Sequence, residues 1–151
     1  MKLAFSTLGC PEFGWSDVYS MAKDLGFQGI EVRGLGDELF DGKTKPFQQE
    51  NLPKTLAQLK KIRMNISCIK FPEKAEETRR ELLRSIDVAS QLEAPFVRIL
   101  GDLSPAPDGE VDDAVVLKAL KALIPYAEEK GVTLLVETNG VYADASRLAS
   151  L

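Results

Sequence analysis

The feature that most constrains the fold is a repeated alternation of short apolar segments with longer amphipathic segments along the chain. The short segments are rich in β-branched and aromatic residues and have the length of strands. The longer segments repeat apolar residues at the spacing of one helix face. Strict alternation of strands and helices is typical of a parallel sheet joined by right-handed crossovers. The sequence therefore predicts an α/β fold of about five strand–helix units.

The boundaries of these units follow from turn residues and helix-capping residues. We predict strands at residues 2–7, 29–33, 66–70, 95–101 and 132–136. We predict helices from Ser16, as N-cap, to about Leu25, from Leu52 or Pro53 to Met64, from Ala75 to Leu92, from Asp112 or Asp113 to Lys130, and from Asp144 onward. Gly26 is expected to cap the first helix at its carboxyl end. Residues 34–50 are expected to form a long polar loop.

Length and composition place the chain among ordinary globular proteins. Its 151 residues suffice for one domain with a core, and we predict a single domain over residues 1–151. The chain is 44% hydrophobic and 28% charged, and it contains no apolar stretch of about 20 residues that would span a membrane. The apolar run at the amino terminus has only three residues, too few for a signal peptide, so a cytoplasmic location is expected.

Charge and residue types exclude several classes of site. The net charge is -4, and basic residues are interspersed with acidic ones, which argues against a nucleic-acid-binding surface. The two cysteines, Cys10 and Cys68, lack the spacing of a zinc motif, and the chain has no histidine to complete one. We expect both to be buried or free thiols. No glycine-rich phosphate loop follows any predicted strand, so a nucleotide site of that kind is not supported.

One carboxylate is singled out by its position at the end of the last predicted strand. The apolar run from Val132 to Val136 stops abruptly at Glu137, and a turn follows. Ligands collect at the carboxyl ends of strands in α/β folds, so the position of Glu137 favours a functional role. The alternative interpretation is a structural carboxylate that accepts hydrogen bonds from backbone amides or from an arginine.

Alternation along the strands separates charged residues from apolar ones. The polar face, expected to line a barrel interior, carries Glu31, Arg33, Ser67, Arg98 and Glu137. The opposite face, expected to pack against the helices, carries Ile30, Val32, Val97, Ile99, Leu134 and Val136. Charged residues inside a fold must be paired or liganded, so Arg33 and Arg98 either bind substrate or neutralise the two acids. Lys70, beside the end of the third strand, either contacts a phosphate or carboxylate or is a solvated charge.

Four segments together resemble a known family. They are residues 2–7, 26–33, 96–101 and 132–140, and the resemblance runs through the whole chain in order. This combination resembles the sugar phosphate isomerase and epimerase superfamily, the xylose isomerase-like TIM barrels. The resemblance implies a (β/α)8 barrel, of which this chain would be the amino-terminal five units. We accordingly expect a partial TIM barrel.

The resemblance also implies a metal site. In the family, a glutamate that ends the fifth strand binds a divalent ion such as Mn, Mg or Zn, and here that residue is Glu137. The family's remaining ligands, an Asp, a His and a further acidic residue, come from strands six to eight, beyond the five units expected here. Many members have a His two residues after the Glu, where this chain has Asn139. Asn139 can hydrogen-bond a sugar hydroxyl but cannot act as a base.

The implied function is that of a metal-dependent isomerase or epimerase acting on a sugar or sugar phosphate. A divalent ion at Glu137 would polarise a ketose carbonyl and its neighbouring hydroxyl, while a proton is removed and returned through an enediolate. Arg33, Arg98, Asn139 and Lys70 are the expected substrate-binding residues. As a truncated chain, the protein is expected to be inactive alone.

The alternative is a non-catalytic fragment that self-associates. An open sheet of about five parallel strands leaves its first and last strands as unpaired edges, and such edges bind other chains. A homo-oligomer formed through these edges is therefore expected. The other partners expected are small-molecule sugars or sugar phosphates, with neither nucleic acid nor a membrane among them.

Overall fold

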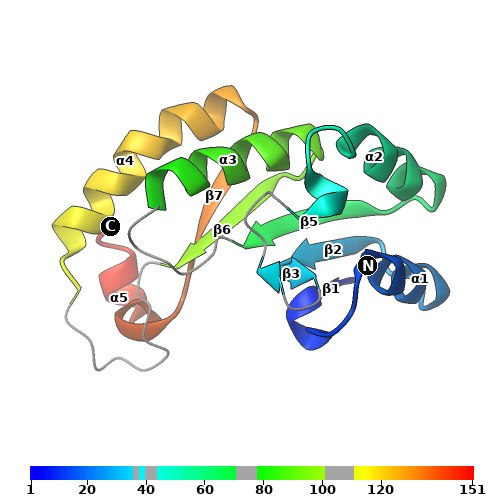
Figure 1. Ribbon diagram of the computed structural model, residues 1–151. Helices are drawn as coiled ribbons and strands as arrows, with labels where there is room; N and C mark the ends of the chain where they lie inside the picture. The colour runs from blue at the N-terminus through cyan, green and yellow to red at the C-terminus, as the bar shows by residue number, and fades with distance from the viewer. Residues whose placement is uncertain (36–37, 40–43, 71–77, 101–110) are drawn as a thin grey trace.

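The chain forms a curved parallel sheet whose strands follow one another in chain order. The computed structural model describes residues 1–35, 38–39, 44–70, 78–100 and 111–151. Its five-stranded sheet has the order β1-β2-β5-β6-β7, and every neighbouring pair is parallel (Figure 1). The strands are β1 Ala4–Ser6, β2 Gly29–Val32, β5 Asn65–Lys70, β6 Phe96–Leu100 and β7 Thr133–Glu137. The predicted parallel α/β architecture is confirmed.

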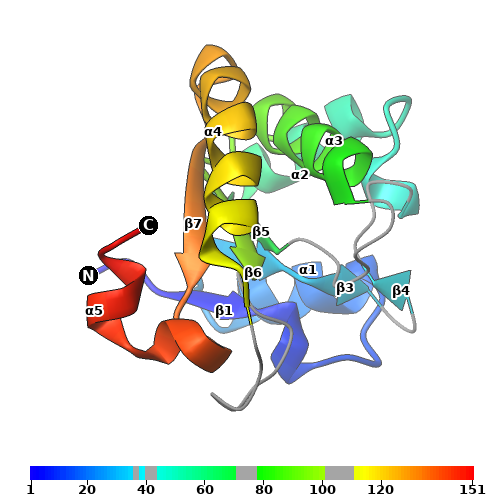
Figure 2. The same cartoon turned by 90° about the vertical axis from the view of Figure 1, so that its left-hand side faces the viewer.

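A helix follows each strand of this sheet along the chain. These helices are α1 Trp15–Asp24, α2 Leu52–Lys61, α3 Thr78–Gln91, α4 Asp113–Glu129 and the short α5 Ala145–Leu148. Figures 1 and 2 show α2, α3 and α4 on one side of the curved sheet. Asp112 is the N-cap of α4, because its carboxylate accepts a hydrogen bond from the Ala114 amide at 2.9 Å. The predicted start of this helix is therefore confirmed.

The core lies between the helices and one face of the sheet. Strand residues Ile30, Val32, Val97 and Ile99 are buried there, and Leu134 and Val136 pack against them. Helix residues meet them from the other side, among them Val18, Leu59, Ile86 and Leu123. This is the apolar face that strand alternation predicts. The opposite face carries the charged residues Glu31, Arg98 and Glu137, together with the exposed apolar residues Phe96 and Leu135.

Four helices end in the same kind of turn. In each, the amide of an apolar residue donates to the carbonyl five residues earlier: Phe27 to Ala22, Met64 to Leu59, Ala94 to Ala89 and Val132 to Ala127. The residue before each donor has a positive φ: Gly26 72°, Arg63 56°, Glu93 57° and Gly131 69°. This is the Schellman arrangement, which satisfies carbonyls at the helix end and turns the chain into the next strand. The predicted glycine cap at Gly26 is confirmed.

Two local predictions about the first helix and the following loop are wrong. The N-cap of α1 is Gly14 and not Ser16, because the Asp17 carboxylate accepts a hydrogen bond from the Gly14 amide at 3.1 Å and starts the helix earlier. Residues 34–50 are not simply a loop. They contain the antiparallel pair β3 Gly34–Leu35 and β4 Glu38–Leu39, and the 3-10 helix η2 Lys45–Phe47.

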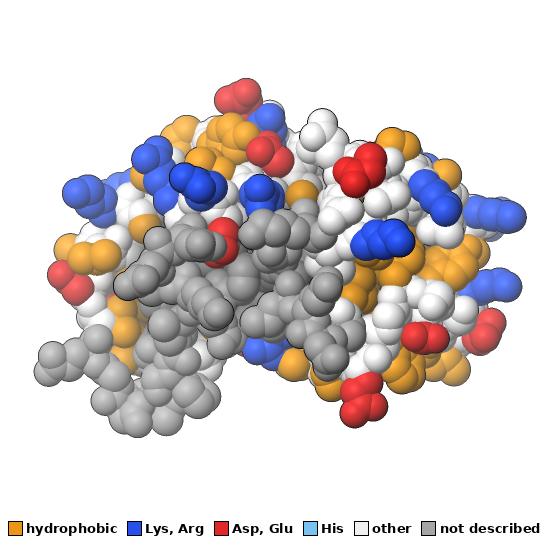
Figure 3. All heavy atoms as spheres, in the orientation of Figure 1, with side chains coloured by type: hydrophobic (Ala, Val, Ile, Leu, Met, Phe, Trp, Pro, Cys, Tyr) orange, Lys and Arg blue, Asp and Glu red, His pale blue; other side chains and the backbone are white. Residues whose placement is uncertain are grey.

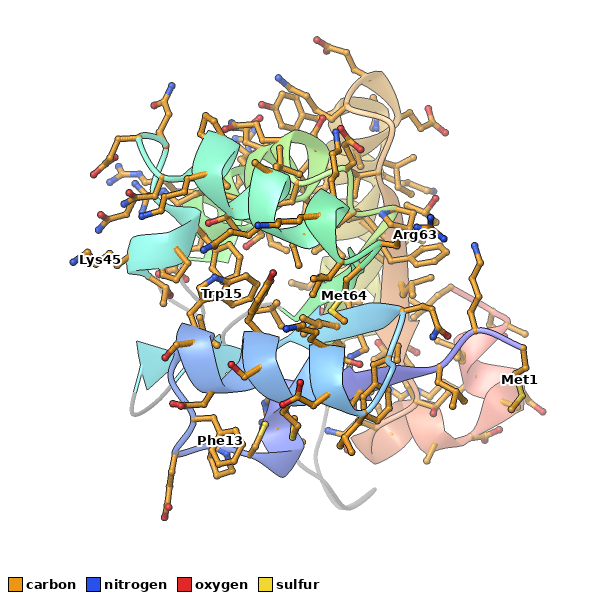
Figure 4. All side chains as sticks on the ribbon, turned by 90° about the vertical axis from the view of Figure 1, so that its right-hand side faces the viewer. Met1, Phe13, Trp15, Lys45, Arg63 and Met64 are labelled. Carbon is orange, nitrogen blue, oxygen red and sulfur yellow. The ribbon has the colours of Figure 1, made fainter. Side chains whose placement is uncertain are left out.

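The 3-10 helix η2 is anchored by an aromatic contact that local sequence does not reveal. The Phe47 side chain is buried and meets the Trp15 ring edge-on, with centroids 5.3 Å apart. Figure 4 shows Trp15 between α1 and the segment that begins at Lys45. A contact across more than 30 residues of chain therefore folds a polar stretch onto the core.

The register of β5 differs from simple alternation. Between β2 and β5, Ile30 pairs with Ile66 but Glu31 pairs with Cys68, because the register shifts by one residue. Cys68 is therefore the register partner of Glu31. The prediction that Ser67 lines the barrel interior concerns a side chain outside what the structure describes. The predicted start of the third helix at Ala75 lies outside the described residues.

The surface carries a mixture of positive and negative side chains, as the interspersed charges of the sequence predict. Side chains of Lys and Arg lie among those of Asp and Glu on the face shown in Figure 3. No helix in the described part of the chain combines the length and apolar character needed to cross a bilayer. The expected absence of nucleic-acid partners stays a prediction.

Replacing the left-handed arginine after α2 should stabilise the fold. Arg63 is exposed and has a φ of 56°, a conformation that a side chain disfavours and glycine adopts freely. We expect Arg63→Gly to raise the free energy of unfolding by about 1 kcal/mol. Urea unfolding followed by circular dichroism measures this, with Arg63→Ala as the control that keeps the Cβ and should change little.

Glu93→Gly provides a graded comparison. Glu93 also has a positive φ, but its carboxylate pairs with the Lys60 ammonium at 2.6 Å. The pair is exposed, so its loss costs less than about 1 kcal/mol, and the gain from glycine should be smaller than at Arg63. A loss of stability in both glycine variants would contradict the argument from φ.

Candidate functional site

Three charged side chains meet on the face of the sheet opposite the helices. They are Glu31 of β2, Arg98 of β6 and Glu137 of β7. One guanidinium nitrogen of Arg98, Nη2, pairs with Glu31 Oε1, and the other, Nη1, lies 3.1 Å from Glu137 Oε1. Each of the three side chains is between 23% and 29% exposed. Arg98 therefore bridges two carboxylates that sequence places far apart.

Strand alternation and register explain this meeting. Glu31 and Arg98 alternate with buried apolar neighbours, so both leave the core and point to the other face. Glu137 ends β7, and its register partner on β6 is Leu100, two residues beyond Arg98. The strand β5 lies between β2 and β6, so the Arg98 side chain reaches across it to Glu31. The Ser6 hydroxyl, from β1, donates to Glu31 at 3.4 Å.

A single guanidinium serves both acids because of its shape. Arginine presents its donors in a planar fork, so its two terminal nitrogens can bind different carboxylates. Two carboxylates and one guanidinium leave the cluster with a formal charge of about -1. This arrangement is what the ion-pair interpretation of Arg98 predicts. Its assignment to substrate binding stays a prediction.

Other predicted site residues lie at the same end of the strands. The Arg33 amide follows β2 and donates to the Thr7 hydroxyl at 2.9 Å, which ties the ends of β1 and β2 together. The Asn139 amide donates to the Glu137 carbonyl at 2.9 Å, and the Asn139 carbonyl accepts from the Tyr142 amide at 3.0 Å. Asn139 thus forms the turn directly after Glu137.

The structure describes the backbone of Lys70 but not its side chain. It is the last residue of β5, and its register partner on β6 is Arg98. Its side chain lies outside what the structure describes, as does that of Cys68. The other cysteine, Cys10, is a free thiol whose pKa is raised by burial, so it stays protonated at neutral pH.

The described residues offer part of a metal site. Glu137 suits a divalent ion by donor type, because Mg²⁺ and Mn²⁺ prefer carboxylate oxygens. Within the ranges the structure describes, however, no group of three or more His, Cys, Asp or Glu side chains is placed to hold a metal. Two carboxylates, Glu137 and Glu31, lie together on this face of the described sheet, and both bind Arg98. Glu137 as a metal ligand stays a prediction.

A second cluster fixes the chain just after Glu137. Arg147 of α5 donates from Nε and Nη2 to the Asp113 carboxylate at 3.0 to 3.2 Å, and also to the Val111 carbonyl at 2.8 Å. The Tyr142 hydroxyl donates to the same carboxylate at 2.8 Å, and the Tyr142 side chain is fully buried. Figures 1 and 2 show α5 next to the amino-terminal end of α4. This clamp fixes Tyr142, whose amide donates to the Asn139 carbonyl in the turn that follows Glu137.

Sequence reasoning missed this clamp. Asp113 and Arg147 are 34 residues apart, and Asp113 was visible only as a helix-starting residue. Its hydrogen bonds to Arg147 and Tyr142 hold the pKa of the Asp113 carboxyl below its ordinary value of 3.8. The carboxylate is thus kept ionised at neutral pH, where it pairs with Arg147.

The comparison with protein families identifies the chain. Residues 19–146 match the family described as Xylose isomerase-like TIM barrel. The chain belongs to this family. Among curated proteins, none matches the chain. The family assignment agrees with the resemblance and with the parallel strand–helix units of the structure.

Several solved structures share the fold of this chain. The probable 3-DHS dehydratase AsbF from Bacillus anthracis aligns with 99% of this chain at a TM-score of 0.75 and 15% identity. A xylose isomerase-like TIM barrel protein from Mycobacterium smegmatis, in complex with magnesium, aligns with 99% at a TM-score of 0.66 and 18% identity. The IOLI protein with a bound zinc atom aligns with 90% at a TM-score of 0.66 and 14% identity.

The chain covers only part of each of these proteins. It spans 58% of the AsbF chain, 60% of the mycobacterial chain and 51% of the IOLI chain. At these identities the likeness shows the fold. The chain thus has the architecture of a partial xylose isomerase-like barrel, as the sequence predicts.

Replacing Asp113 should weaken the clamp in a pH-dependent way. The folded-state pKa of Asp113 is lowered, so its stabilising contribution is complete above the unfolded value and is lost as pH falls below it. We expect Asp113→Asn to lower the free energy of unfolding at pH 7, and the difference from wild type to shrink below about pH 4.

Urea unfolding between neutral and acidic pH measures this difference. Asp24→Asn, at an exposed position in α1, is the matched control and should show no such trend. A difference between wild type and Asp113→Asn that is the same at every pH would mean that shape, and not charge, explains the effect.

Proposed function

We propose that this chain carries part of the active site of a metal-dependent isomerase or epimerase acting on a sugar or sugar phosphate. The observation that carries the proposal is the position of Glu137. It is the last residue of β7 in a xylose isomerase-like barrel, on the sheet face that also presents Glu31 and Arg98. Ligands in such barrels bind at the carboxyl ends of the strands.

Glu137 is the residue that would hold the metal. One fold relative is described in complex with magnesium and another with a zinc atom, which supports a divalent ion for this chain. When bound, such an ion stabilises the negative charge that develops on a carbonyl oxygen as a neighbouring proton is removed. The described carboxylates fall short of a full ligand set, so the chain alone is expected to be inactive.

The other residues would bind and orient the substrate. The Arg98 guanidinium can donate to substrate oxygens from the position between Glu31 and Glu137. The Asn139 amide group, in the turn after Glu137, suits a sugar hydroxyl. Arg33 and Lys70 follow or end neighbouring strands and would bind a phosphate if the substrate carries one.

Removing the charge of Glu137 should weaken metal binding. We expect Glu137→Gln to lower the affinity of the chain for Mn²⁺ at least about tenfold, because an amide oxygen replaces an ionised hard ligand. Electron paramagnetic resonance of free Mn²⁺ during a titration measures the affinity. Glu129→Gln, an exposed position in α4, is the control. Equal affinities of wild type and Glu137→Gln would rule out Glu137 as the ligand.

A second candidate function is non-catalytic: the chain would be a fragment that self-associates. One structural feature favours this alternative. The strand β7 ends the sheet order on one side, and beside it lies an apolar groove of about 400 Å³ between β7, α4 and α5. Its apolar lining comes from Leu117, Leu120, Ile124, Val132, Leu134, Val136, Leu148 and Leu151. A second copy of the chain would cover this groove while pairing with the edge strand.

Charge placed in the groove should weaken self-association. Ile124 lines this groove and is 41% exposed. In an Ile124→Lys variant, self-association would bury an unpaired charge, which is unfavourable. We therefore expect sedimentation velocity to show a shift toward monomer. Val115→Lys is the matched control, because Val115 is also exposed on α4 but lies outside the groove. A wild-type chain that is monomeric and unfolds cooperatively would contradict the self-association proposal.

A further inference from the structure

We propose that the chain carries a second binding site, for an uncharged sugar or another polyol, on the helix side of the sheet. The site is an open pocket of about 480 Å³ between α3 and the segment that joins η2 to α2. Figure 1 shows these elements on one side of the sheet, whereas Arg98 and its two carboxylates lie on the opposite face. Small-molecule sites have volumes of about 300–1,000 Å³, so the pocket has a suitable size.

The pocket combines an apolar floor with a polar rim. Three buried side chains form the floor: Phe47, Leu52 and Val88. Amide, guanidinium and carboxylate groups form the rim, and they come from Gln48, Gln49, Glu50, Arg84, Asp87 and Gln91. A sugar ring is divided in the same way, because its C–H groups make apolar faces and its hydroxyls project from its edge. Amides both donate and accept hydrogen bonds, as hydroxyls do.

The charges of the rim are balanced, which favours an uncharged ligand. The Asp87 carboxylate pairs with the Lys130 ammonium of α4 at 3.3 Å. Arg84 and Glu50 carry opposite charges on the same rim. These four groups have a formal net charge of about zero at neutral pH. A phosphate or an ammonium ligand would therefore gain little net attraction, whereas hydroxyl groups would find both donors and acceptors.

Local hydrogen bonds fix the wall that leads from η2 into α2. The Gln48 carbonyl accepts a hydrogen bond from the Asn51 amide at 2.8 Å, which closes the turn that carries Gln49. The Thr55 hydroxyl donates to the Pro46 carbonyl at 2.6 Å and joins η2 to the first turns of α2. This wall is therefore held in place before a ligand arrives.

Contacts with α4 fix the wall formed by α3. The Tyr126 hydroxyl donates to Asp87 Oδ1 at 2.6 Å, and Lys130 Nζ approaches the same oxygen. The Ser90 hydroxyl donates to the Lys130 carbonyl at 2.8 Å. Because both contacts of Asp87 use Oδ1, its other oxygen, Oδ2, can accept from a ligand hydroxyl. A pocket whose walls are held before binding loses less conformational entropy when it is filled.

A titration with D-glucose, followed by nitrogen-15 NMR of the whole chain, tests the site. We expect saturable shifts of the side-chain amide signals of Gln49 and Gln91. Arg84→Gln removes a rim donor and should lower the affinity at least about fivefold, the factor expected for one hydrogen bond. Arg80→Gln is the matched control, because Arg80 is also exposed on α3 but lies outside the pocket. This control should bind glucose as the wild type does.

A second variant keeps the test decisive if Arg84→Gln does not fold. Gln91→Ala removes one rim amide at an exposed position and should weaken glucose binding by a similar factor. Site-specific spectra are needed because sugars in solution stabilise most folded proteins without binding to them. Circular dichroism establishes whether each variant is folded.

Three results would overturn the inference. The first is the absence of saturable glutamine shifts with glucose. The second is an equal loss of affinity in Arg84→Gln and Arg80→Gln, which would indicate general adsorption to α3. The third is saturation by glycine, a zwitterion, or by inorganic phosphate in place of glucose, which would refute the ligand class. None of these results depends on Glu137, so the function proposed above stands or fails separately.

Discussion

Burial of alternate strand residues against the helices is the constraint from which the site follows. Ile30, Val32, Val97 and Ile99 occupy the core, so the residues between them must face the other way. Two of those residues, Glu31 and Arg98, are charged and only partly exposed. Charges in such a place need partners, and Arg98 supplies one for Glu31 and for Glu137 at once. Packing on one face thus produces the charged cluster on the other.

The sequence predicts what rests on periodicity and misses what rests on distant contacts. Gly26 marks its helix end because glycine is the residue expected there, but Arg63 and Glu93 adopt the same backbone without a signal in the residue type. The sequence predicts only a loop for residues 34–50, because this segment is anchored by a distant contact. That contact joins Phe47 to Trp15. The pairing of Glu31 with Cys68 comes from a register shift between β2 and β5, which no pattern within one strand records.

In the candidate site, too, the sequence predicts the features that follow from strand alternation and misses those set by distant contacts. Alternation predicted that Glu31, Arg98 and Glu137 share a face, and their ion pairs confirm that they meet. Alternation could not reveal that one guanidinium binds both acids, because that depends on how far a side chain reaches across β5. The clamp of Asp113, Tyr142 and Arg147 was invisible for a related reason. Its members come from two helices and a turn that only the folded chain brings together.

Agreement between strand order and chain order has a consequence for how the molecule is assembled. Each strand pairs with the one that precedes it in the main sheet, and four units end in the same turn. Every new strand therefore pairs with a neighbour that is already made. The connection between them contains one α-helix, with β3, β4 and η2 added between β2 and β5. Contacts remain local in sequence, which favours rapid folding. Such a chain can form progressively from its amino terminus during synthesis, each unit serving as the template for the next.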